Sequence, residues 1–148
     1  MTGRVFYAPF DSIQVTTDAD QDVWELGAVT NKLKLLAFEM TSEAIAAESI
    51  DLRLVRRSTT GNGAAVTEVR AATDSAAPLA VVEQLGTIPG TIGDIICGWK
   101  WEQLGPLIYM PTPEMQITLD AGAFLCLNIQ SALAGTTGWS GYICWEEI

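Results

Sequence analysis

Short runs of alternating hydrophobic and polar residues recur along this chain, and each run is broken by Gly, Pro, Asp or Thr. Residues 50–57 are the clearest case, because Ile50, Leu52 and Leu54 share one parity while Asp51 and Arg53 occupy the other. Successive side chains of a strand point to opposite faces, so this run predicts a half-buried strand. Residues 33–41 are apolar at both the odd and the even positions, which predicts a strand covered on both faces.

The same pattern extends over the whole chain. Strands are predicted over residues 4–8, 12–17, 23–26, 33–41, 50–57, 65–70, 79–83, 94–101, 107–110, 115–119, 124–129 and 139–148. Residues 60–63, Thr-Gly-Asn-Gly, predict a hairpin turn that returns into 65–70. Residues 41–49 predict a loop with one helical turn, for which Ser42 is a candidate cap. No stretch of a dozen residues has the helical period, so we expect an antiparallel β-sandwich or barrel with little helix.

Two segments lack a clear pattern and are predicted to contact a partner. Residues 1–10 are expected to form an N-terminal arm, and residues 71–93, rich in Ala, Thr, Gly and Pro, a long loop. Side chains such as Phe6 and Phe10 would each gain about 1.5–3 kcal/mol if a partner buried them. On this hypothesis, deletion of residues 1–9 leaves a folded sandwich that no longer binds.

The length and the net charge of the chain limit the classes of function that we expect. The 148 residues suit a single domain. Although 49% of them are hydrophobic, no apolar run approaches the about 20 residues of a membrane helix, and no secretory signal is evident. The net charge of −10 argues against nucleic acid as a partner. The acidity fits either simple solubility or a partner with a positive surface.

The residue types that usually carry chemistry are missing or poorly spaced. The chain has no histidine, which removes Ser-His-Asp relays and most catalytic zinc sites, and it has no phosphate-binding loop. Asp18, Asp20 and Asp22 match the first half of a calcium-binding loop, but Val23 and Val29 occupy the positions of its Gly and Glu. We therefore predict no catalytic, cofactor or metal site, and no enzyme activity.

The cysteines, carboxylates and tryptophans have structural interpretations. Free buried thiols are expected at the cysteines, with a Cys97–Cys126 or Cys126–Cys144 bridge as the alternative. Two carboxylates suffice for glycoside hydrolysis, but the candidates are chosen by type alone: Glu102, Glu114, Glu146 and Glu147. Large aromatic side chains favour the core over a sugar-binding platform, and the residues concerned are Trp99, Trp101, Trp139 and Trp145.

Several short motifs follow one another in a characteristic order. They are Asp-Val-Trp-Glu-Leu at 22–26, Ile-Asp-Leu-Arg-Leu at 50–54, Gly-Asn-Gly at 61–63, Gly-Trp-Lys-Trp at 98–101, Pro-Thr-Pro-Glu at 111–114 and Ser-Gly-Tyr-Ile-Cys-Trp-Glu-Glu at 140–147. In this order the chain resembles the head decoration, or cement, proteins of tailed bacteriophages and related capsid accessory proteins. Residues 71–93 depart most from that pattern.

The resemblance implies a jelly-roll-like β-sandwich over residues 1–148 and a homotrimer. Such a protein binds across major capsid protein subunits on the virion surface after assembly in the host cytoplasm. The family brings no catalytic residues, cofactor, metal, nucleic acid or membrane partner. The alternative is a carbohydrate- or receptor-binding β-sandwich module on a virion, which would expose Trp99, Trp101 and Trp139.

Overall fold

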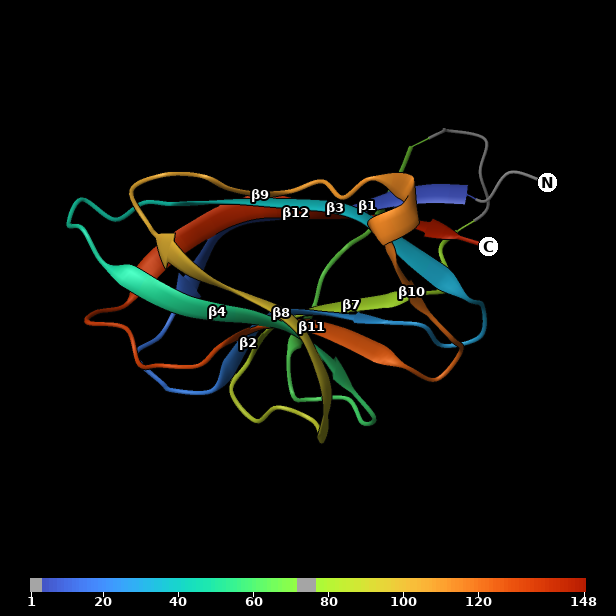
Figure 1. Cartoon of the computed structure of the whole chain (residues 1–148), viewed down its shortest axis with the longest axis horizontal. Helices are drawn as coiled ribbons and strands as arrows, with labels where there is room; N and C mark the ends of the chain where they lie inside the picture. The colour runs from blue at the N-terminus through green and yellow to red at the C-terminus, as the bar shows by residue number, and fades with distance from the viewer. Residues whose placement is uncertain (1–3, 72–76) are drawn as a thin grey trace.

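The computed structural model describes residues 4–71 and 77–148, which form two antiparallel sheets packed face to face (Figure 1). Sheet A has the order β10-β3-β12-β1-β6, with β9 also paired to β3; sheet B has the order β5-β7-β2-β11-β4-β8. The strands of sheet A are β1 (Arg4–Val15), β3 (Leu33–Ser42), β6 (Val69–Arg70), β9 (Leu107–Tyr109), β10 (Ile117–Leu119) and β12 (Thr137–Glu147). The strands of sheet B are β2 (Gln21–Gly27), β4 (Ser49–Arg57), β5 (Ala64–Ala65), β7 (Val81–Gly86), β8 (Ile92–Glu102) and β11 (Phe124–Ile129).

The predicted all-β sandwich with little helix is confirmed. Helix in the described residues is limited to the three-residue 3-10 turn η1 (Pro113–Met115), so none of it is long enough to cross a membrane. The core lies between the sheets, and Ile50, Leu52 and Leu54 of β4 project into it with at most 1% of their surface exposed. The strict alternation of β4 therefore identified its buried face correctly.

β3 is covered on one face only, contrary to the prediction from its sequence. The register with β12 shifts between Trp145, which faces Leu35, and Cys144, which faces Ala37. Leu36 is the extra residue of this bulge, and the parity of the strand changes there. Leu35 and Phe38 consequently both enter the core, although an unbroken strand would turn them to opposite faces.

The strand predicted at residues 4–8 is confirmed as part of β1, and the predicted N-terminal arm is therefore wrong for residues 4–10. The strand pairs with β12 from Arg4 opposite Glu147 to Val15 opposite Thr137. Phe6, Ala8 and Phe10 are buried in the core, so this segment stabilises the sandwich itself. Residues 1–3 lie outside the described part of the chain.

The segment that follows β4 also differs from the prediction. Residues 60–63 do not close a hairpin onto β4, whose partners are β11 and β8. Instead β5 pairs with β7, and β6 pairs with β1 in the other sheet. Gly63 permits this arrangement, because a Cβ added there would lie 2.8 Å from the Cβ of Glu83 on β7.

In the part of the chain that the structure describes, the predicted loops are shorter than expected and contain no helical turn. Within residues 71–93, β7 forms the embedded strand that the sequence predicted, β8 already begins at Ile92, and residues 72–76 lie outside the description. The loop 43–48 has no helix, although Ser42 Oγ accepts a hydrogen bond of 3.0 Å from the Ala44 N–H.

Candidate functional site

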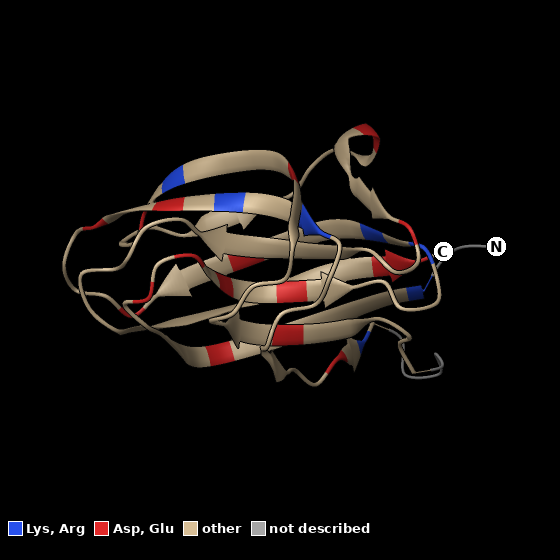
Figure 2. Ribbon diagram, turned by 90° about the horizontal axis from the view of Figure 1, so that it is seen from below, with Lys and Arg blue, Asp and Glu red and all other residues tan. Residues whose placement is uncertain are grey.

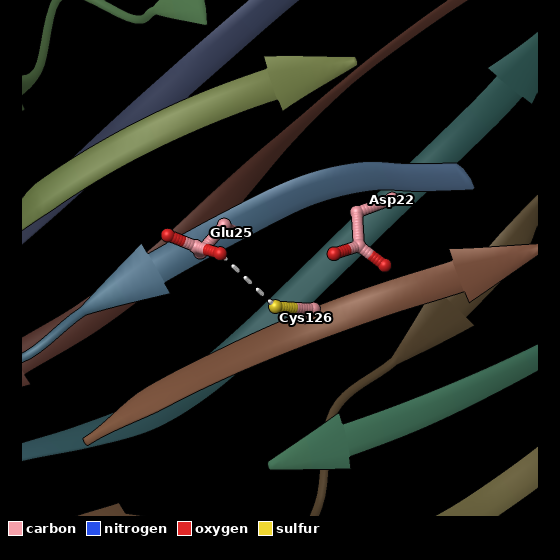
Figure 3. A group of neighbouring side chains, drawn as sticks. All are labelled: Asp22, Glu25 and Cys126. Carbon is pink, nitrogen blue, oxygen red and sulfur yellow. Dashed lines mark hydrogen bonds between the residues drawn. The ribbon is translucent and has the colours of Figure 1, made fainter. Parts of the chain in front are cut away.

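A buried polar cluster on the outer side of sheet B is the main candidate for a catalytic or metal site. Asp22 and Glu25 on β2 and Cys126 on β11 bring a ligand atom each within 4.8 Å of one another, and all three are buried (Figure 3). They are covered because the segment after β4 packs over this part of the sheet, where Thr60 and Gly61 contact Glu25.

Both carboxylate oxygens of Asp22 accept hydrogen bonds from neighbouring side chains. Arg57 on β4 donates two hydrogen bonds to its carboxylate, from Nε at 3.0 Å and from Nη2 at 2.8 Å, and both side chains are 3% exposed. Asn128 Nδ2 donates a further bond of 2.9 Å to Asp22 Oδ1. Such bidentate pairing fixes both oxygens, which leaves this carboxylate unsuited to a metal ion.

Glu25 and Cys126 are also held in place by hydrogen bonds within the protein. The Glu25 carboxylate accepts hydrogen bonds from Thr60 Oγ1 at 2.6 Å, the Gly61 N–H at 3.1 Å and the Cys126 thiol at 3.6 Å. Burial raises the pKa of Cys126, and the charges of Asp22 and Glu25 raise it further. A protonated thiol is a poor metal ligand and a poor nucleophile, so we assign this cluster a structural role.

Glu83 faces this cluster from the neighbouring strand. It lies opposite Glu25 in the β2–β7 pairing, and its Oε2 is buried without a hydrogen-bond partner. Desolvation and the charge of Glu25 raise its pKa, and a backbone hydrogen bond from Gly63 partly opposes them. The space bounded by these side chains does not admit a water-sized molecule, so no ligand site is present between them.

The carboxylates named from the sequence do not converge. Glu102 ends β8 and Glu114 lies in η1. Glu146 and Glu147 are adjacent on β12, and Glu147 is buried, where it bonds Arg4 and the N–H groups of Leu79 and Ala80. These positions do not form the facing pair that glycoside hydrolysis requires.

The aspartates of the calcium-like segment are held by protein groups. Asp20 and Asp22 both accept hydrogen bonds from Asn128 Nδ2, at 3.1 and 2.9 Å, and each also pairs with an arginine, Arg53 and Arg57 respectively. Asp18 accepts a hydrogen bond of 2.7 Å from Thr16 Oγ1, so the three carboxylates are engaged by neighbouring donors.

The tryptophans and cysteines follow the structural interpretation. Trp101 is 5% exposed, Trp139 and Trp145 are fully buried, and only Trp99 of the four is partly exposed. Trp101 and Trp139 pack edge to face, with ring centroids 5.0 Å apart. Cys97, Cys126 and Cys144 are free thiols, as predicted; Cys126 and Cys144 are buried as expected, whereas Cys97 is half-buried.

The outer side of sheet A carries a surface that sequence analysis missed. Two cross-strand rows face away from the core: Tyr7, Cys144 and Ala37 form one, and Pro9, Tyr142, Glu39 and Ile108 form the other. We call these seven residues the apolar sheet face. Tyr7 and Ile108 are 38% and 54% exposed, whereas Cys144 is only 6% exposed, and Tyr7 packs edge to face with Tyr142.

The apolar sheet face carries little charge. It spans four hydrogen-bonded strands, and Glu39 is its one charged residue. Exposed contiguous apolar surface on a rigid scaffold usually marks a protein contact. Alternation could have revealed it only if the bulge at Leu36 had been known.

Comparisons with protein-family models, with curated proteins and with solved structures found no match to this chain.

Proposed function

We propose that this chain is a structural protein of a tailed-phage virion that binds the outside of the capsid shell and catalyses no reaction. The motif order described above supports the family. The proposal of a binding role rests on the apolar sheet face. Exposed apolar surface of this kind is stabilised when a protein partner covers it and removes it from water.

We further propose that a second copy of the chain covers the apolar sheet face. At a net charge of −10, copies repel one another, and contact is favoured where the surface carries least charge. Closed symmetric oligomers are the common outcome of such contacts, and the family resemblance favours a trimer. An oligomer also presents several shell-binding surfaces at once, which strengthens attachment by multivalency.

The alternative of a carbohydrate- or receptor-binding module receives less support. It needs aromatic rings on the surface, whereas Trp101 and Trp139 are core residues. Trp99 contributes to the core as well, since its ring packs edge to face against Phe38 at 5.8 Å.

Co-sedimentation with capsid shells tests the proposal. The purified protein would be mixed with shells of its phage that lack it, and the pellet assayed for saturable binding. We expect the protein in the pellet at a fixed ratio to the major capsid protein. Protein that stays in the supernatant at every concentration would contradict the proposal.

A further inference from the structure

Four loops form the end of the sandwich that lies away from the two chain termini (Figure 1). They are residues 43–48 after β3, residues 103–106 after β8, residues 130–136 after β11 and residues 16–20 after β1. We call this region the distal end. Ile45, at the tip of the first loop, is 99% exposed, and Leu104 in the second is 54% exposed. Burial of this Ile by a partner would be favourable, because its side chain would leave water.

The distal end is held by a dense set of hydrogen bonds. Gln103, which is 4% exposed, donates from Nε2 to Glu48 Oε2 at 3.2 Å and to the Ala46 carbonyl at 3.4 Å. Glu48 Oε1 accepts a bond of 2.8 Å from the Ala134 N–H, which ties the first loop to the third. Ile45 therefore projects from a loop whose base is already fixed, and binding through it would require little ordering.

Acidic side chains predominate at the distal end. Asp18, Asp20, Glu43, Glu48 and Glu102 lie in or beside the loops, and the four loops contain none of the eight Lys and Arg residues (Figure 2). Lys100, beside the loops on β8, is paired with Asp51 at 2.9 Å. A shallow groove of about 510 Å³ runs beside Ile45, between the first and third loops. The surface thus combines an apolar projection, a groove and a negative rim.

We infer that the distal end is the part of this protein that docks on the capsid shell, with Ile45 entering an apolar socket that Lys or Arg side chains of the shell protein surround. This inference rests on the proposed function. A second copy is a poor occupant, because two acidic ends would repel each other, whereas a basic rim complements them.

Three variants and the shell co-sedimentation assay test the inference. Ile45→Asp removes the apolar contact, and the double variant Glu43→Gln, Glu102→Gln removes charge while keeping hydrogen-bond acceptors. Val29→Asp is the matched control, since Val29 is 52% exposed in the loop between β2 and β3, at the opposite end. Circular dichroism and urea unfolding would first establish that each variant folds as the wild type does.

We expect Ile45→Asp to weaken shell binding by roughly tenfold or more, and Val29→Asp to bind as the wild type does. The double Gln variant should bind more weakly at low salt and should lose part of the salt dependence. If Ile45→Asp does not fold, the shell binding of the double Gln variant alone tests the inference. Wild-type affinity and salt dependence in the folded distal-end variants would overturn this inference and leave the proposed function standing. Failure of the wild type to bind would overturn both.

Discussion

At the scale of single residues, buried polar groups hold the outer side of sheet B together. Asp22 and Arg57 are 35 positions apart in sequence and meet only because β11 lies between their strands. Sequence analysis placed Asp22 in a failed calcium loop, and no local signal linked it to Arg57. Pairings of this kind depend on strand order, which a single sequence does not specify.

Replacement of Arg57 by Ala should destabilise the protein by about 3–5 kcal/mol, because it leaves the buried charge of Asp22 uncompensated. Urea unfolding at neutral pH would measure the loss. Lys100→Ala is the control: Lys100 pairs with Asp51 at 2.9 Å but is 79% exposed, and exposed pairs contribute at most about 1 kcal/mol. Equal effects of the two changes would refute the structural role of the Arg57–Asp22 pair.

Glu83 should make stability decrease with rising pH. Its pKa is raised in the folded protein by desolvation and by Glu25, so the folded state favours the protonated carboxyl. The resulting contribution to the free energy of unfolding is complete at pH values below the ordinary pKa of 4.5. It is lost as the pH rises through the raised pKa of the folded protein. Glu83→Gln should therefore be more stable than the wild type at pH values above the raised pKa, and this advantage should shrink as the pH falls. Urea unfolding across this range measures the difference, and a difference that does not vary with pH would exclude this origin.

At the scale of elements, strands without bulges were predicted well from alternation. The bounds predicted for the strand at 124–129 match β11, and the run at 50–57 matches β4 apart from its first residue. The run at 33–41 matches β3 apart from its last residue, but the bulge at Leu36 hid which face of this strand is buried. In β1 the register shifts between Phe10 and Ile13, where Ser12 has a φ of 49°, so one long strand was predicted as two, at 4–8 and 12–17.

Deletion of residues 1–9 should prevent folding, in contrast to the expectation from sequence. The deletion removes about half of β1, including the buried Phe6 and Ala8, and exposes the edge of β12. Phe6→Ala alone should cost about 3–5 kcal/mol. Thermal unfolding followed by circular dichroism would check both variants; a cooperative transition near the wild-type temperature in the deletion would show that β1 is dispensable.

At the scale of the whole molecule, composition and alternation were sufficient to predict the all-β sandwich. They could not predict which surfaces remain uncovered. The apolar sheet face combines residues from β1, β3, β9 and β12, and the distal end combines four loops that come from different parts of the sequence. Both surfaces exist only once strand order and register are set.

The apolar sheet face should mediate self-association. A double variant, Tyr7→Glu and Ile108→Glu, places two charges on this face and should shift the oligomer toward monomer, because burying unpaired charges is costly. Sedimentation equilibrium would measure the distribution. Ile88→Glu is the control, since Ile88 is 69% exposed in the loop between β7 and β8. An unchanged mass in the double variant would place the contact elsewhere.

The copy number of the protein in purified virions is the decisive test of a structural role in the capsid. Quantitative mass spectrometry of particles purified by density gradient would give its ratio to the major capsid protein. We expect many copies per particle, at a fixed ratio that is reproducible between preparations. Absence of the protein from intact particles, or trace amounts that vary from one preparation to the next, would contradict a structural role in the virion.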